Sequence, residues 1–77
     1  MAYTIKELAQ ANECETHDMF GLADIWLYWY TNNCCETSSI QDFLSLNNEG
    51  RITMLRYLQS DGVYEELFLY ILPHIYD

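Results

Sequence analysis

Residues 16–30 read THDMFGLADIWLYWY and decide the fold. Thr16 can cap a helix, and Asp18 would then lie in its first turn, where the helix dipole favours a carboxylate. Bulky side chains that share one helical face give a second signal: Leu22, Trp26 and Trp29. The aromatic stretch 25–30 would also suit a β-strand. We predict a helix that is apolar almost all the way round, so it lies at the centre of the fold or meets a partner with its second face.

Helix signals recur on both sides of this segment. Residues 4–7, TIKE, match a capping box that opens a first helix ending near Asn12. Residues 38–39 can cap a short third helix, residues 47–50 predict a turn, and the hydrophobic spacing of residues 52–58 predicts a fourth helix.

The last predicted helix begins near residues 60–62, SDG, and Pro73 ends or kinks it at about Leu72. A chain of 77 residues is long enough for one domain and no more. We therefore predict a single all-α domain, residues 1–77, in which four to five short helices form a compact bundle.

The charge balance is the most informative feature of the composition. Twelve Asp and Glu residues accompany only three basic ones, and the net charge is −9. Because 51% of the residues are hydrophobic, the chain is not a disordered acidic tail. The negative net charge argues against direct binding of nucleic acid or of an anionic membrane, because both need a basic surface. Most carboxylates have no cation partner within the chain, so a basic protein is the partner that their field attracts.

The start of the chain and its cysteines indicate a soluble cytoplasmic protein. Residues 1–7 contain no basic region followed by an apolar run, as a secretory signal would. The longest apolar stretch, residues 25–30, is far shorter than the roughly twenty residues that cross a bilayer. The odd number of cysteines, three, favours free thiols over a closed disulfide framework.

Neither a metal site nor an active site is expected. Four residues are the alternative zinc ligands: Cys14, His17, Cys34 and Cys35. They lack the paired spacing of structural zinc sites, so we predict no metal and no cofactor. The sequence also has no G-x-G-x-x-G, P-loop or H-E-x-x-H motif, and its two histidines, His17 and His74, are expected to be surface or packing residues rather than catalysts. We therefore expect a protein without catalytic residues, not an enzyme.

Two groups of residues are candidates for binding a partner. The acidic candidates gather around the first inter-helix loop and the start of the last helix, with one between them: Glu13, Glu15, Asp18, Glu36, Asp61, Glu65 and Glu66. The aromatic candidates belong to a residue type favoured at interfaces: Tyr28, Tyr30 and Tyr64. Plainer explanations exist for both groups. The acids would stabilise a helix start, lie on a solvated loop or serve solubility, and large aromatic residues such as Trp26 would anchor the core.

Glu13-Cys14-Glu15 and Tyr64-Glu65-Glu66 illustrate the character of the whole chain, which is short, acidic, aromatic-rich and free of catalytic motifs. In that character it resembles the small anti-defence proteins of phages and mobile elements, anti-CRISPR proteins first and anti-restriction DNA mimics second. The resemblance implies a stoichiometric inhibitor in the host-cell cytoplasm. Such an inhibitor sits on a CRISPR effector complex or a nuclease, often where DNA would bind, and engages Lys and Arg side chains.

We therefore expect a non-enzymatic inhibitor that blocks DNA recognition by a basic nucleic-acid-binding protein through an acidic surface. The alternative is a small acidic helical regulatory or adaptor module that binds a protein partner through exposed aromatic side chains. In that alternative, the second and the last helix supply the apolar surface, which would also suit a homodimer.

Overall fold

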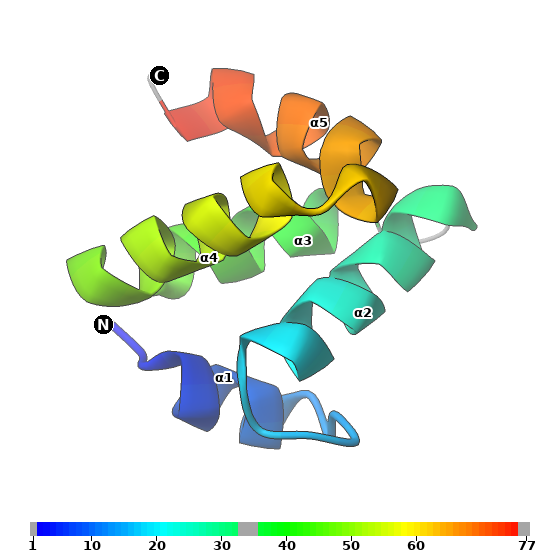
Figure 1. Ribbon diagram of the computed structural model, residues 1–77. Coiled ribbons are helices and arrows are strands. Elements are labelled where there is room, and N and C mark those ends of the chain that lie inside the picture. The colour runs from blue at the N-terminus through cyan, green and yellow to red at the C-terminus, as the bar shows by residue number, and fades with distance from the viewer. Residues whose placement is uncertain (1, 33–35, 76–77) are drawn as a thin grey trace.

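Residues 2–32 and 36–75 are described in a computed structural model of the chain (Figure 1). Five α-helices and one short 3-10 helix, η1, make up this part of the chain, which confirms the all-α prediction. Their bounds are α1 Ile5–Ala11, α2 Met19–Thr31, α3 Glu36–Ser45, α4 Asn48–Ser60, η1 Gly62–Tyr64 and α5 Glu65–Ile75. Figure 1 shows α1 and α5 at opposite ends of the molecule, with α4 between them and α2 along one side. The aromatic stretch 25–30 is helical rather than a strand.

Side-chain hydrogen bonds set the start of α1 as the sequence predicts. The backbone N–H of Glu7 donates to Thr4 Oγ1 at 3.1 Å, and the N–H of Thr4 donates to Glu7 Oε1 at 3.0 Å. This completes the capping box. Just before it, the N–H of Tyr3 donates to the carbonyl of Ser45 at 2.8 Å, and the N–H of Asn47 donates to the carbonyl of Tyr3 at 2.8 Å. These two bonds tie the segment before α1 to the link between α3 and α4.

The start of α2 differs from the prediction, because Asp18 and not Thr16 is its N-cap. Asp18 Oδ1 accepts the N–H of Gly21 at 3.1 Å, and Thr16 Oγ1 donates to the same oxygen at 2.9 Å. Asp is at least as good an N-cap as Thr, and its charge also interacts favourably with the helix dipole. Thr16 therefore supports the cap instead of forming it.

The start of α4 is the second difference. The side chain of Asn47 accepts the N–H of Gly50 at 2.7 Å and caps a helix that begins at Asn48. The turn predicted over residues 47–50 is therefore wrong. The same residue types that favour turns also favour N-caps, and here the cap is formed.

The remaining differences concern α3 and α5. α3 begins at Glu36, ahead of the serine pair at 38–39 that was predicted to cap it. α5 continues through Pro73 to Ile75, so it does not end at about Leu72, which was one of the two outcomes predicted for Pro73. The proline lacks the N–H that would donate to the carbonyl of Leu69, so α5 loses that bond and continues for only two more residues.

The core lies where α2, α3, α4 and α5 meet. Its fully buried large side chains come from all four helices and from the link between α3 and α4: Leu22, Trp26, Phe43, Leu46, Met54, Leu58, Leu67 and Ile71. Trp26 anchors the core as predicted and packs edge-on against Phe43, with ring centroids 6.3 Å apart. The indole N–H of Trp26 donates to Asp42 Oδ2 at 3.2 Å, and the Asn12 amide donates to the same oxygen at 2.8 Å. One face of α2 is thus buried in the core, and the opposite face is exposed to solvent.

Candidate functional site

The chain between α1 and α2 crosses closely over the first turn of α2, and this crossing builds the candidate site. A Cβ atom placed on Gly21 would lie 2.0 Å from the carbonyl oxygen of Thr16, far closer than van der Waals contact allows. Glycine is the residue that leaves room for the loop at this position. The close crossing therefore fixes the loop against the helix.

The loop turns sharply as it leaves α1. Glu13 has a φ of 56°, in the left-handed region that few residues other than glycine adopt. The N–H of Cys14 then donates to the carbonyl of Ala9 at 3.0 Å, and the N–H of Glu13 donates to that of Gln10 at 3.1 Å. Cys14 is buried, whereas Glu13 and Glu15 are exposed. The turn thus presents two carboxylates to solvent on either side of an inward-facing thiol.

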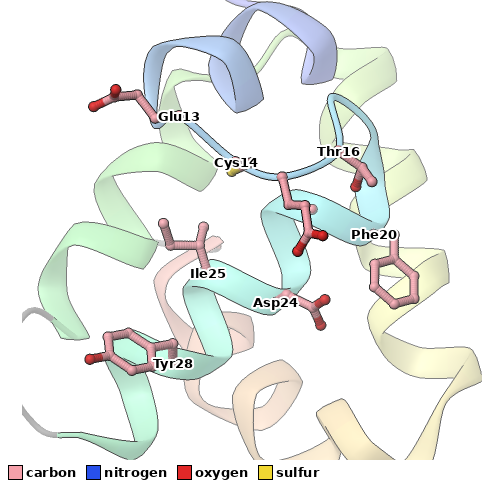
Figure 2. A pocket seen from close by; sticks show the side chains of 9 residues that line it. Glu13, Cys14, Thr16, Phe20, Asp24, Ile25 and Tyr28 are labelled. Carbon is pink, nitrogen blue, oxygen red and sulfur yellow. The ribbon is translucent and has the colours of Figure 1, made fainter.

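Loop and helix together form an open groove of about 450 Å³ (Figure 2). Its acidic lining residues come from the loop and from α2: Glu13, Glu15 and Asp24. Its larger apolar and aromatic lining side chains are those of Cys14, Phe20, Ile25 and Tyr28. We call this feature the acidic groove. It combines negative charge with an apolar wall.

Three residues of the acidic groove follow one another along the outer face of α2: Phe20, Asp24 and Tyr28. Residues four apart are neighbours on a helix, so the three share one face. The exposed fraction is 52% for the side chain of Phe20 and 62% for that of Tyr28. Figure 2 shows Asp24 between the two rings along the helix. The Asp24 carboxylate lies on the side of Phe20, and the ring of Tyr28 extends to the other side of the helix (Figure 2).

Asp24 is held in place by a residue from η1. The hydroxyl of Tyr64 donates to Asp24 Oδ1 at 2.7 Å. Tyr64 is only 4% exposed, and burial, followed by the bond to Asp24, raises its pKa far above the ordinary value, so the phenol remains a donor. Its ring packs against Tyr57 with centroids 5.5 Å apart, and Tyr57 packs against Phe20 at 6.5 Å. The rings of Phe20, Tyr57 and Tyr64 therefore pack in series and connect the groove to the buried Tyr64.

In the first group of predicted acidic residues, two line the groove and the third caps a helix. Glu13 and Glu15 line the groove. Asp18 is exposed at the N-cap of α2, and its pKa is lowered first by the N–H of Gly21 and then by the hydroxyl of Thr16. The position of Asp18 is therefore explained by the start of the helix.

The second group lies at the start of α5. Asp61 is the N-cap of η1 and accepts a backbone N–H at 3.1 Å. Glu65 and Glu66 are exposed in the first turn of α5, near the positive end of its dipole. Because Tyr64 bonds to Asp24, the segment that carries these acids lies against α2. Capping of η1 explains the position of Asp61, and the α5 dipole explains those of Glu65 and Glu66.

The predicted aromatic residues have three different environments. Tyr28 is exposed in the acidic groove, whereas Tyr30 is half-buried and packs against Tyr70 with centroids 5.2 Å apart. Tyr64 is buried because its ring fills the space behind Asp24, which corrects the expectation that this ring is exposed to a partner. The last acidic candidate, Glu36, begins α3, and its side chain lies outside the described part of the structure.

Sequence reasoning missed two residues at the centre of the groove, Phe20 and Asp24. Their signal is the four-residue spacing with Tyr28, together with a carboxylate in the middle of an otherwise apolar helix. The bond from Tyr64 to Asp24 joins residues 40 positions apart, and no local pattern reveals it.

Two further findings concern possible metal ligands and membrane-spanning helices among the described residues. Within residues 2–32 and 36–75, no group of three His, Cys, Asp or Glu residues is placed to hold a metal ion. Cys34 and Cys35, which belong to the alternative zinc site, lie outside the described residues. In that same part of the chain, no helix has the length and apolar character needed to cross a bilayer.

No protein-family model matches the chain, and no curated protein or solved structure matches it. The acidic groove is therefore interpreted from its own chemistry. Its carboxylates attract cations, and its rings and the side chain of Ile25 offer apolar contact. Lys and Arg combine a charged head with an apolar stem, so their side chains match both parts of the groove.

Proposed function

We propose that the protein is a stoichiometric, non-enzymatic inhibitor that binds the basic surface of a nucleic-acid-handling protein through its acidic groove. The observation that carries this proposal is the groove lining, in which carboxylates lie beside the exposed rings of Phe20 and Tyr28. Carboxylates recognise cationic groups, and the rings add contact area and cation–π attraction. This combination favours a basic segment of a protein as the ligand.

The charge of the whole chain favours the same kind of partner. The net charge is −9, and one of the few cations, Arg51, is engaged with the backbone. Its guanidinium donates to the carbonyls of Leu44 and Leu46 at the end of α3. Little positive charge is left to neutralise the acids from within. The resulting field would speed encounter with a cationic surface, and added salt would weaken it.

A DNA-binding surface is the cationic surface that this proposal favours. Duplex DNA carries one charge per ~1.7 Å of its axis, so proteins that handle it display extended basic channels. The groove acids Glu13, Glu15 and Asp24 line one open groove, and together they can occupy part of such a channel. The resemblance to anti-CRISPR proteins makes a CRISPR effector complex the first partner to test.

A DNA-competition assay tests the proposal. Purified CRISPR effector complexes of several types are loaded with guide RNA and titrated with the protein, and binding of labelled target DNA is measured. We expect at least one complex to lose DNA binding at a stoichiometric amount of the protein. In a separate titration without DNA, the affinity of the protein for that complex should fall as salt is raised. Unchanged DNA binding in every complex, with the protein in excess, would reject inhibition by occupation of a DNA site.

Two variants of equal net charge separate the groove from total acidity. The groove variant carries amides at three lining positions: Glu13→Gln, Glu15→Gln and Asp24→Asn. The control variant carries amides at three exposed acids outside the groove: Glu49→Gln, Glu65→Gln and Glu66→Gln. We expect the groove variant to lose inhibition and the control to keep most of it. Equal loss in both variants would assign the effect to the overall charge.

The exposed apolar side chains favour a second candidate, a regulatory or adaptor module that binds mainly through apolar contact. Besides the rings of the groove, Val63 and Leu69 are 68% and 56% exposed near and on α5. The ligand would then be another protein or a second copy of the chain. An affinity that does not change with salt, or a doubled mass in light scattering, would favour this candidate over the inhibitor.

A further inference from the structure

The outer face of α2 carries features that suit one cation better than others. We propose that the acidic groove selects arginine over lysine, with the guanidinium paired to Asp24 beside the ring of Phe20 and with Tyr28 as a second ring farther along the groove. This inference rests on the proposed function, in which the groove binds a basic protein segment, and names the side chain that the groove reads.

The spacing along α2 supports a flat cation. Four residues advance a helix by about 6 Å, so Phe20 and Tyr28 each lie one such step along α2 from Asp24. A guanidinium is planar, stacks on aromatic faces and is weakly hydrated, whereas an ammonium is a compact and strongly hydrated point charge. Because the ring of Phe20 is more than half exposed on the same side as Asp24, a guanidinium at Asp24 can contact that ring, and the exposed ring of Tyr28 can contact a neighbouring guanidinium of the same segment. Lysine would gain less from those rings.

The bond from Tyr64 supports pairing with a guanidinium. The buried hydroxyl fixes Asp24 Oδ1 at 2.7 Å and so restricts the rotation of the carboxylate before any ligand arrives. A carboxylate has about four acceptor positions, so this one bond leaves capacity for two more N–H donors. A preoriented carboxylate loses less conformational entropy on binding, and a forked donor uses its orientation most fully.

The rest of the groove suits the stem and the neighbours of that arginine. Ile25 adds an apolar wall beside Asp24, along which methylene groups can lie. Glu13 and Glu15 face the groove from the loop and provide negative charge for further basic residues in the same segment. The occupant that fits is therefore a basic peptide segment with an arginine at its centre.

Peptide binding tests the preference. Fluorescein-labelled hexa-arginine and hexa-lysine carry equal charge, and their dissociation constants are measured by fluorescence anisotropy at low salt. We expect hexa-arginine to bind about fivefold more tightly or better, because two exposed rings each favour the guanidinium. The Asp24→Asn variant should reduce this preference to less than about twofold, and the Tyr28→Ala variant should reduce it by roughly half.

Matched controls keep the result interpretable. Glu49→Gln removes one carboxylate outside the groove, and Leu69→Ala removes an exposed apolar side chain from α5. Both controls should keep the full preference for hexa-arginine. Helical circular dichroism of each variant confirms that the fold is retained, and Tyr28→Ala serves as the ring variant because Phe20 also packs against Tyr57.

The possible failures are distinguishable. If both peptides bind equally and both are weakened by Asp24→Asn, the arginine preference is overturned, and the groove remains a site for basic segments. If neither peptide binds at low salt, or if neither is weakened by the groove variants, the arginine inference and the proposed function fail together. A preference for hexa-arginine that survives Asp24→Asn would overturn the role of Asp24.

Discussion

The acidic groove and the start of α5 carry similar charge for different physical reasons. At the start of α5, Asp61 caps η1, and Glu65 and Glu66 lie where a helix dipole favours them. In the groove, Glu13 and Glu15 lie on a loop and cap no helix, and Asp24 occupies the middle of α2. Helix formation explains the acids at the start of α5 without any ligand. It does not explain the three acids of the groove, so these are the better candidates for binding a partner.

The largest effect is expected where the groove is built, at Gly21. In Gly21→Ala, the new methyl group would meet the carbonyl oxygen of Thr16 at 2.0 Å, and backbone must move to relieve the overlap. We expect the free energy of unfolding to fall by about 2–3 kcal/mol, as in other overpacked sites. For a domain of this size, that corresponds to a loss of roughly 10 °C or more in the melting temperature. Urea and thermal unfolding followed by circular dichroism measure both.

Gly62 provides the matched control at the start of the other region. A Cβ on Gly62 meets nothing within 4 Å, and its φ is not in the left-handed range. We expect Gly62→Ala to leave stability unchanged or to raise it by up to about 1 kcal/mol, because the unfolded chain loses freedom. Equal destabilisation by both alanines would contradict the view that only the groove depends on a close crossing.

The next largest effect is expected in Tyr64→Phe, which removes the hydrogen bond that links the segment before α5 to Asp24 of the groove. Loss of the bond to Asp24 should cost about 1 kcal/mol of unfolding free energy and weaken the binding of hexa-arginine. In the wild type, burial raises the pKa of Tyr64, so its contribution to stability is present below the pKa of a free tyrosine, about 10, and is lost as the pH rises through the higher folded value. Tyrosinate absorbance during an alkaline titration should show a delayed step that the variant lacks. A wild-type titration without such a step would contradict this burial.

A smaller effect is expected at Asp42, which belongs to neither acidic region. Burial raises its pKa, although hydrogen bonds from Trp26 and Asn12 oppose the rise. Its contribution to stability is therefore fully present below the unfolded pKa, about 3.9, and is lost as the pH rises through the folded value. The nearby Cys14 has a raised pKa and stays neutral in this range.

The Asp42→Asn variant tests this by keeping an acceptor and removing the charge. At pH 7, its unfolding free energy should equal that of the wild type or exceed it by up to about 1 kcal/mol. As the pH falls from 7 towards 4, the wild type should gain stability relative to the variant. Denaturant unfolding at several pH values measures the difference. A wild type that is clearly more stable than the variant at pH 7 would show that its charged hydrogen bonds outweigh the burial.

The smallest effect concerns the exposed acids themselves. Glu13→Gln with Glu15→Gln should raise the melting temperature slightly at low salt, because it relieves repulsion in a chain of net charge −9. Glu65→Gln with Glu66→Gln should raise it less or lower it, because a favourable interaction with the α5 dipole is also lost. Calorimetry at low and high salt measures both pairs. A larger rise in the α5 pair would reverse the comparison.

The sequence predicts much of the fold because its signals are local. The capping box at Thr4 and the helical spacing that places Trp26 in the core need only neighbouring residues, and both are confirmed. The predicted start of α2 was wrong because Thr16 and Asp18 can both act as an N-cap. The predicted turn over residues 47–50 was wrong because Asn47 can form either a turn or an N-cap. Local patterns do not decide between these alternatives.

The acidic groove was predictable only in part. Glu13, Glu15 and Tyr28 were recognised from charge and residue type. The importance of Asp24 depends on Tyr64, and the groove depends on the crossing at Gly21. Those contacts form between segments that are apart in the sequence, so neither composition nor periodicity predicts them.

The buried thiol of Cys14 gives the molecule a built-in reporter. Burial, followed by the charge of Asp42, raises the pKa of this thiol, so little thiolate exists at neutral pH while the loop is seated. Its alkylation by iodoacetamide then measures how often the loop lifts from α2. With Cys34 and Cys35 replaced by serine, a single mass shift would record that opening, and any molecule seated in the groove would register as slower labelling of one sulfur atom.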